Sequence, residues 1–310
     1  MADGILQVGP LGTVIATVLL GVVAVLAAGF DGAVGARLQG RRALPGAAAP
    51  VWEGARLLRQ RRRTIVAADS LLWRIGVVGL LVVALLKVAV VPLGAWTVAD
   101  LSVGVVWFNA MDVMVWALVW LVGWGANSAH ALIGGYRFLG QALSYELPLM
   151  FALTGPAIAA GSLRVGEVVA AQEELWFVVW MPVAFLVFCA GVVAFSVWGP
   201  FGAAAGGDIA GGVLAELSGV DRLLLLAGRY ALLSAGAGFA VALFLGGGSG
   251  PFAPAWVWTL VKTLAVLAVL VGVRRLLPVV RPDRLAEVAW IVVLPAVLLQ
   301  LLLVSVVVVR

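Results

Sequence analysis

The stretch GGYRFLGQALSYELP, residues 134–148, decides how this chain must fold, because it places charged and polar side chains directly before an apolar run. The run continues through residues 149–161 and looks able to cross a bilayer. An ionised carboxylate inside such a span costs about 3 kcal/mol or more at the bilayer centre, so it usually faces a protein interior or a wet cavity. We therefore expect Glu146 to lie within a bundle of membrane helices.

The composition of the whole chain agrees with a membrane protein. Of its 310 residues, 64% are hydrophobic and 11% are charged, against about 25% charged in ordinary soluble domains. A soluble fold cannot bury so much apolar surface, so lipid must be the solvent. The sequence predicts an all-α polytopic membrane protein with about eight transmembrane helices, in a single transmembrane domain over residues 1–310.

Hydropathy locates the spans. Each is about 17–25 residues long, enough to cross roughly 30 Å of hydrocarbon at 1.5 Å per residue. The predicted spans are residues 11–29, 72–93, 101–125, 143–162, 175–198, 222–246, 256–273 and 287–309.

Basic residues set the expected orientation. Arginines concentrate in alternate connections, most of all after the first and the seventh span. By the positive-inside rule these connections are cytoplasmic and both termini lie outside. The cytoplasmic connections are approximately residues 30–71, 126–142, 199–221 and 274–286. Residues 1–10 have no basic n-region, so we expect no cleavable signal.

The first connection is expected to carry a helix of its own. Pro45 and Pro50 should break the chain, and after them apolar residues alternate with charged ones at spacings of three and four. This pattern predicts a basic amphipathic helix on the inner membrane face. It could dock a soluble partner, or simply anchor the chain beside the membrane.

The connection at residues 199–221 is rich in glycine. Asp208 and Glu216 are eight residues apart, so they would share a face if the segment were helical.

The composition also argues against resident redox groups. An iron–sulfur cluster takes about four cysteine ligands, and the chain has only Cys189; its single histidine, His130, disfavours haem or zinc. We expect no metal, flavin or iron–sulfur cluster in this chain, so redox cofactors would belong to other chains. The net charge of +5 does not suggest nucleic acid, because the arginines cluster beside apolar spans.

Several stretches, in order, resemble one family over nearly the whole chain: the membrane subunit of respiratory complex I that forms the quinone chamber (the H subunit of bacterial NADH–quinone oxidoreductase, mitochondrial subunit 1). The related membrane subunit of energy-converting hydrogenases and formate hydrogenlyase shares this fold. The matching stretches are ARLQGRR (36–42), WEGARLL (52–58), NSAHALIGGYRFLGQALSYELP (127–148), GSLRVGEVVAAQ (161–172), AELSGVDRLLLLAGRY (215–230) and VKTLAVLAVLVGVRRLLPVVRPDRLAEVAWIVVLP (261–295).

The resemblance implies a quinone as the bound cofactor and partners among the other membrane and peripheral subunits of a complex I-like assembly in a bacterial-type cell membrane. It implies that the chain is a subunit of a redox-driven proton translocase and carries no cofactor for NADH oxidation itself. The expected proton relay consists of Asp31, Glu146, Asp208 and Glu216. The quinone chamber or its cytoplasmic docking surface would include Arg37, Arg41, Arg137 and Tyr230.

Some positions depart from the family. After Pro200–Phe201 the family usually has an acidic stretch, whereas residues 202–207 here read GAAAGG. Arg229 replaces a family glutamate, and arginine stays charged where a proton relay needs groups that exchange protons. The related membrane subunit of hydrogenases, or a membrane anchor that has lost coupling, therefore remains an alternative.

Local structural roles are alternatives for individual residues. Glu146 could pair with Arg137 to seat its helix, and Asp31 could reach the membrane interface. Arg229 is expected to form a salt bridge with Glu216 or Asp208, which would keep local charge balanced.

Overall fold

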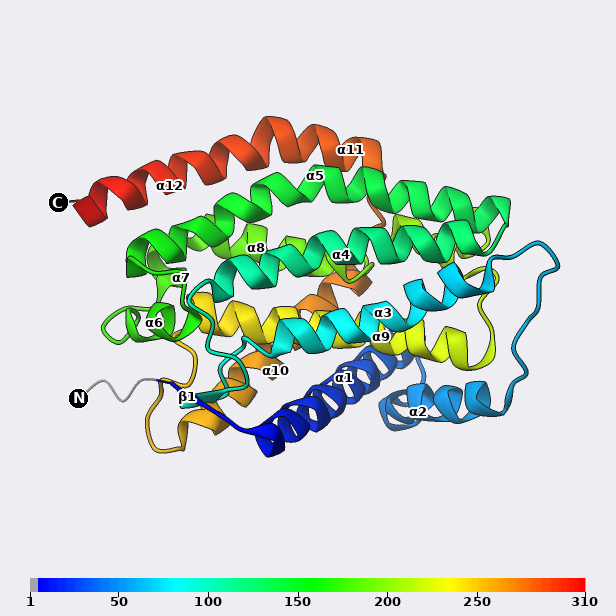
Figure 1. Ribbon diagram of the computed structural model, residues 1–310, viewed down its shortest axis with the longest axis horizontal. Coiled ribbons are helices and arrows are strands. Elements are labelled where there is room, and N and C mark those ends of the chain that lie inside the picture. The colour runs from blue at the N-terminus through cyan, green and yellow to red at the C-terminus, as the bar shows by residue number, and fades with distance from the viewer. Residues whose placement is uncertain (1–4, 310) are drawn as a thin grey trace.

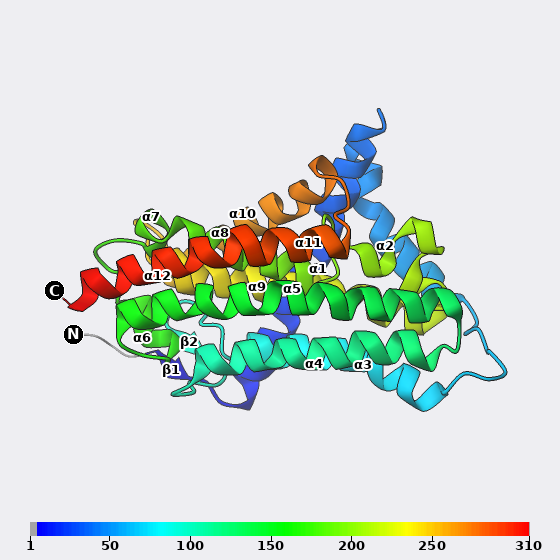
Figure 2. The same ribbon diagram turned by 90° about the horizontal axis from the view of Figure 1, so that it is seen from above.

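Long apolar helices packed side by side make up nearly all of the computed structural model, which describes residues 5–309. Within that part of the chain, seven helices are long and apolar enough to cross a membrane. Figures 1 and 2 show them running along one common direction. The predicted fold class, an all-α polytopic membrane protein, is confirmed.

The helices follow one another with short connections. Their bounds are α1 Pro10–Leu38, α2 Ala43–Arg59, α3 Ser70–Val88, α4 Gly104–Gly125, α5 Ala129–Ala160, α6 Val165–Ala170, α7 Phe177–Trp180, α8 Pro182–Phe195, α9 Gly219–Phe244, α10 Ala255–Leu276, α11 Pro282–Val288 and α12 Leu294–Val309. Three 3-10 turns (Ala203–Ala205, Gly207–Ile209 and Gly212–Leu214) precede α9, and a π-helical turn (Ala289–Val293) joins α11 to α12. Two short strands, β1 Leu6–Gln7 and β2 Trp96–Thr97, pair in parallel.

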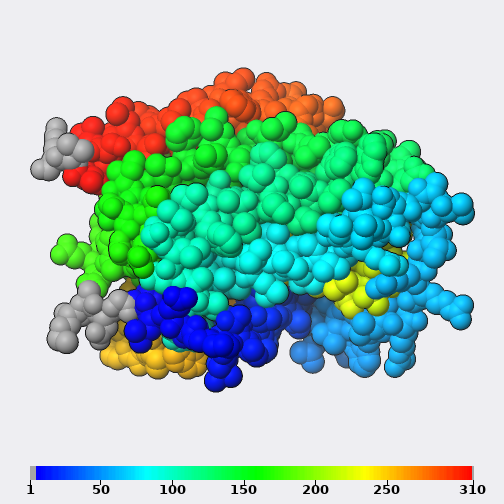
Figure 3. Space-filling view, in the orientation of Figure 1, coloured from blue at the N-terminus to red at the C-terminus, as the bar shows by residue number. Residues whose placement is uncertain are grey.

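The helix α9 forms the centre of the bundle. Every residue from Ala231 to Phe244 is buried, and α9 packs against α1, α3, α8 and α10. Figure 3 shows only its first part, in yellow, between α3 and α2. Small residues in the run SAGAG (234–238) let neighbouring backbones come close, which is how helices associate when lipid supplies no hydrophobic drive.

The fifth predicted span, 175–198, is broken into α7 and α8. Met181 lies between them with non-helical backbone angles (φ −122°, ψ 49°), and Pro182 begins α8. Proline lacks the N–H that a continuous helix would need at this position, so the chain restarts its helix there.

The helix α5 is longer than the predicted span 143–162. It runs for 32 residues from Ala129, about 48 Å at 1.5 Å per residue. Gly134 permits this, because a Cβ there would lie 2.5 Å from the carbonyl oxygen of Ala204. Glu146 therefore lies near the middle of a helix rather than near its start.

The surface helix α2 begins earlier than predicted and continues through both prolines. Pro45 lies in the first turn, where a backbone N–H has no helical partner. Pro50 lies inside the helix and cannot donate to the carbonyl of Gly46, and this carbonyl faces Gly32 of α1, where a Cβ would lie 2.2 Å from its oxygen. The α1–α2 contact thus depends on glycine.

The two ends of the bundle differ. In Figure 1, β1 and the C-terminal end of α12 lie at the left, whereas α2 and the connection to α3 lie at the right. An even number of crossings brings the chain back to its starting side, in agreement with this arrangement. The polar residues of interest lie in two places, the bundle interior and the end that carries α2.

Candidate functional site

An ion pair lies fully inside the bundle, between α3 and α4. Lys87 Nζ contacts Asp112 Oδ1, and both side chains are 0% exposed. The sequence reading did not single out either residue. The signal was present, because Lys87 falls within the predicted span 72–93 and Asp112 within 101–125, and ionisable residues within spans are functional candidates by default.

Aromatic rings surround the ammonium group of Lys87. It lies 4.2 Å from the ring centroid of Phe108 and 3.6 Å from that of Phe195. Phe108 in turn stacks on Phe239 of α9 with ring centroids 3.8 Å apart. A cation over an aromatic face is stabilised by about 2 kcal/mol or more when desolvated, which offsets part of the cost of burying Lys87.

Glu146 reaches the same interior region from α5. Its carboxylate accepts a hydrogen bond from Asn109 Nδ2 of α4 at 3.1 Å, and the residue is 9% exposed. Asn109 and Asp112 are three residues apart on α4, so their side chains are neighbours on one face. The suggested pairing with Arg137 is wrong, because the only ion pair of Arg137 within residues 5–309 is with Asp208, at 2.6 Å.

Several buried polar atoms around this group have no hydrogen-bond partner within the described chain. They are Asn109 Oδ1, Asp112 Oδ2, Trp116 Nε1, Tyr145 OH and Glu146 Oε2. A buried polar atom without a partner costs about 1–3 kcal/mol, so such atoms usually bind ordered water. Their concentration in one place indicates a hydrated polar centre inside the bundle.

A cavity of about 150 Å³ lies beside this centre, between α4 and α5. Asn109 lines it together with apolar residues of both helices, among them Val105, Met150 and Leu153. Asn109 thus touches both Glu146 and the cavity.

A second polar cluster lies toward the α2 end of the bundle, around Asp31 of α1. Arg274 and Arg275, at the end of α10, each donate to one oxygen of the Asp31 carboxylate at 2.9 Å. Tyr230 of α9 donates its hydroxyl to the same carboxylate at 3.3 Å. Asp31 is 5% exposed, so it does not simply reach the interface, and two predicted site residues, Asp31 and Tyr230, meet here.

Trp198 ties this cluster to the segment after α8. Its ring lies 4.4 Å from the guanidinium carbon of Arg274 and 5.5 Å from that of Arg229. Its ring centroid is 4.8 Å from that of Tyr230. The cluster is therefore one packed unit of three helices and a loop.

Arg229 has a different partner from the one predicted. It donates to the backbone carbonyls of Ser196 and Val197, which follow the C-terminal end of α8. A cation there satisfies free carbonyls and matches the negative end of the helix dipole. The expected salt bridge to Glu216 or Asp208 is wrong. Arg229 also fixes Val197, whose φ of +53° is rare for a β-branched residue.

The two loop acids do not share a helical face, because 3-10 turns separate them. Asp208 pairs with Arg137, and the hydrogen bond from that arginine lowers the pKa of Asp208. Glu216 pairs with Arg63 at 2.8 Å and accepts from Ser128 at 3.0 Å. The hydrogen bond from Arg63 lowers the pKa of Glu216. Both acids are thus held as carboxylates.

A cavity of about 440 Å³ opens between α1 and α2. Arg41, Arg42, Gln39 and Arg275 contribute polar groups to its wall, and small residues of both helices complete it. Arg41 and Arg37 are exposed, but only Arg41 lines the cavity. Arg275 belongs both to this cavity and to the Asp31 cluster.

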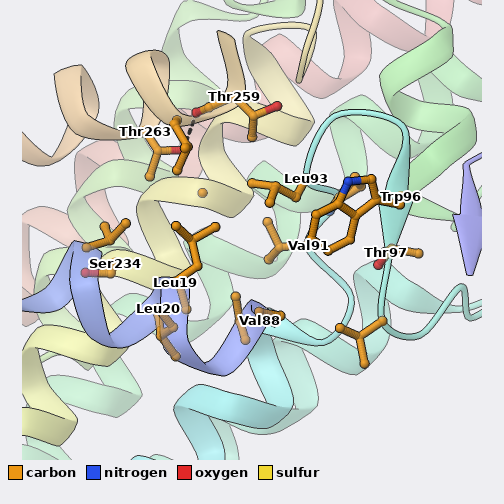
Figure 4. Close-up of a pocket in the computed structure, with 17 residues that line it drawn as sticks. Leu19, Leu20, Val88, Val91, Leu93, Trp96, Thr97, Ser234, Thr259 and Thr263 are labelled. Carbon is orange, nitrogen blue, oxygen red and sulfur yellow. Dashed lines mark hydrogen bonds between the residues drawn. The ribbon is translucent and has the colours of Figure 1, made fainter. Parts of the chain in front are cut away.

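A third cavity, of about 60 Å³, lies between α1, α9, α10 and the segment after α3 (Figure 4). Its wall is apolar apart from the hydroxyl groups of Thr97, Ser234, Thr259 and Thr263. Thr263 donates to the carbonyl of Thr259 at 2.7 Å, so this hydroxyl is already satisfied. The cavity has no ionisable side chain in its wall and supplies no acid–base group.

The cofactor expectation concerns metals as well. Within the part of the chain that the structure describes, no three His, Cys, Asp or Glu side chains gather in a way that could hold a metal ion. The side chains that the structure does bring together suit proton exchange and hydrogen bonding.

These observations define the class of the protein: a polytopic helical membrane protein with a hydrated ionisable centre inside its bundle and a basic end. The family model described as NADH dehydrogenase matches residues 11–305. The chain therefore belongs to this family, that of the H subunit of NADH-quinone oxidoreductase, the membrane subunit of respiratory complex I.

Curated relatives agree with this assignment, and each of them is an H subunit of NADH-quinone oxidoreductase. The one numbered 2 in Geobacter sulfurreducens is 37% identical over 82% of this chain and 80% of its own length. That of Geobacillus kaustophilus is 36% identical over 78% of this chain and 74% of its own length. The one numbered 2 in Cereibacter sphaeroides is 41% identical over 66% and 65%, respectively.

Proposed function

We propose that this chain works within a complex I-like NADH-quinone oxidoreductase, where it lines the quinone chamber and passes protons through its bundle. The observation that carries the proposal is the position of Arg275, which lines the α1–α2 cavity and also holds Asp31. A ligand in that cavity would touch a residue that sets the charge balance of the buried cluster.

The α1–α2 cavity fits a quinone head group in size and chemistry. Ligand pockets usually measure about 300–1,000 Å³, and this one has about 440 Å³. The carbonyl oxygens of a quinone accept hydrogen bonds, and Arg41, Arg42 and Arg275 are donors that stay charged. When bound, a quinone takes up two electrons and two protons, and the electrons would come from cofactors in partner subunits.

Filling the cavity tests quinone binding. Ala49 of α2 lines the cavity, whereas Val51 of the same helix is 59% exposed and does not line it. In the purified complex, we expect Ala49→Phe to raise the KM for a soluble quinone at least fivefold, while the matched control Val51→Phe leaves it unchanged. Equal KM values for the two variants would refute quinone binding at this place.

Proton transfer is proposed at Glu146, with Asp31 at the α2 end of the bundle. Glu146 has one oxygen hydrogen-bonded to Asn109 and the other without a partner in the described chain, so it has room to bind a water molecule or a proton. Asp208 and Glu216 are proposed as surface acids that link the relay to the cytoplasmic side, beside Arg137 and Arg63.

Vesicles that contain the complex test the relay. We expect Glu146→Gln to abolish most proton uptake, because the amide cannot exchange a proton. The matched control is Glu287→Gln, an exposed glutamate paired with Arg284 on α11. Unchanged uptake with Glu146→Gln would remove the relay role and leave the chain as a membrane anchor.

The orientation in the membrane is also proposed from charge. The arginine-rich end with α2 would face the cytoplasm, where the basic surface helix would dock peripheral subunits, and both termini would lie outside. Phe252 and Arg61 are solvent-exposed and lie at opposite ends. In intact cells, a membrane-impermeant maleimide should label Phe252→Cys, and it should label Arg61→Cys only after permeabilisation.

A further inference from the structure

The buried Lys87–Asp112 pair lies where the proposed relay has its central acid. Asp112 contacts Lys87 and is a neighbour of Asn109 on the same face of α4, and Asn109 donates to Glu146. Glu146 lies within electrostatic reach of both Asp112 and Lys87. The three charged side chains therefore act as one group rather than as a pair and a separate acid.

The charge of this group constrains its protonation. With both carboxylates ionised, one ammonium group leaves a net charge of −1; with one added proton the group is neutral. Burying an uncompensated charge costs several kcal/mol, and Asp112 and Lys87 are 0% exposed. The neutral state, with one proton on one of the two carboxyl groups, is the one that the apolar surroundings favour.

The surroundings also offer partners for a mobile proton. Asp112 Oδ2 and Glu146 Oε2, one oxygen of each acid, have no partner within residues 5–309, and the neighbouring Asn109 Oδ1 is also without one. Asn109 lines the 150 Å³ cavity between α4 and α5. Water there would lie beside Asn109 and close to the carboxyl groups.

We propose that Lys87, Asp112 and Glu146 form one proton-holding centre, which carries a single exchangeable proton shared by two carboxyl groups and exchanges it at the α4–α5 cavity beside Asn109. On loading, a hydronium ion in the cavity gives its proton to a carboxylate oxygen and becomes water. On release, the carboxylic acid returns the proton to water. Lys87 keeps its three protons throughout and supplies the fixed positive charge. This inference rests on the proposed role of Glu146 and deepens it.

The number of protonated carboxyl groups distinguishes this centre from an isolated Glu146. In infrared difference spectra of the purified complex at pH 7, variant minus unaltered, the C=O stretch of one carboxylic acid should be lost in Glu146→Gln. It should be lost equally in Asp112→Asn, because Lys87 and Glu146 then neutralise each other without a proton. The matched control Asp100→Asn removes an acid paired with Arg164 and should leave that band in place.

Proton uptake gives a second readout. In vesicles, the double variant Lys87→Met/Asp112→Leu should reduce uptake at least tenfold, because Glu146 would stay protonated without its cation. Replacing both charged residues by apolar ones of similar volume is often tolerated. If this variant does not assemble, the infrared comparison of Asp112→Asn with Glu146→Gln decides alone.

The outcomes separate the two proposals. An acid band that persists in Asp112→Asn, or normal uptake by the double variant, would overturn the shared centre while Glu146→Gln still abolished uptake. Normal uptake with Glu146→Gln would instead overturn the proposed function itself.

Discussion

Two acid–base contacts of this protein have similar chemistry and opposite surroundings. Lys87 and Asp112 meet in the bundle interior at 0% exposure, whereas the Arg63 and Glu216 side chains meet beside the 3-10 turns at 53% and 24% exposure. Exposed pairs contribute about 0–1 kcal/mol to stability, whereas breaking a buried pair costs about 3–5 kcal/mol. The comparison teaches that burial, more than contact geometry, decides what a salt bridge does.

Breaking the interior pair should have the largest effect. Lys87→Met leaves Asp112 buried without its cation, and we expect it to destabilise the chain by about 3–5 kcal/mol. The measurement is the temperature at which tryptophan fluorescence reports unfolding in detergent micelles. In the double variant with Asp112→Leu most of this loss should be recovered; an equally large loss would mean that packing, not charge, is at stake.

The Asp31 cluster should fall between the two extremes. Asp31→Asn removes a charge that accepts hydrogen bonds from Arg274 and Arg275, and hydrogen bonds to charged groups contribute about 1.5–3 kcal/mol. We expect a clear loss of thermal stability, smaller than that of Lys87→Met because the arginines are partly exposed. A loss as large as that of Lys87→Met would contradict the ranking by burial.

The exposed pair of Glu216 should respond to pH. Arg63 lowers the pKa of Glu216 below its ordinary value of 4.5, so the folded state binds this proton less readily than the unfolded chain does. The stabilisation is fully present above pH 4.5 and is lost as pH falls through the lowered pKa. The melting temperature of Glu216→Gln should therefore approach that of the unaltered protein at low pH and differ only above it. A difference that persisted unchanged below the lowered pKa would contradict this assignment.

The smallest effect is expected at Asp208, whose side chain is 63% exposed beside Arg137. Asp208→Asn should leave the melting temperature nearly unchanged at physiological salt, because solvent and ions screen this contact. Any difference seen at low salt should disappear on addition of salt. A loss that resisted salt would show that Asp208 has a partner beyond Arg137.

Part of the fold and of the site followed from the residue pattern. Runs of about 20 apolar residues specify membrane helices, and Glu146 was placed in the interior because an ionised acid is costly in lipid. Asp31 and Tyr230 were expected in the functional region and do meet. The reading of residues 43–50 was wrong, since α2 continues through Pro50; only the packed position of Gly46 against Gly32 explains why the free carbonyl is tolerated.

The sequence by itself determined that this chain spans a membrane as a helical bundle, which family it belongs to, and that its few internal charges matter. These properties are sums or matches along the chain, so no contact is needed to read them. Only the tertiary structure decided which charges meet: Lys87 with Asp112, Glu146 with Asn109, Asp31 with two arginines, and Arg229 with the end of α8. Such pairs depend on how far each helix slides and turns against its neighbours, and that is fixed by side-chain packing between segments distant in sequence.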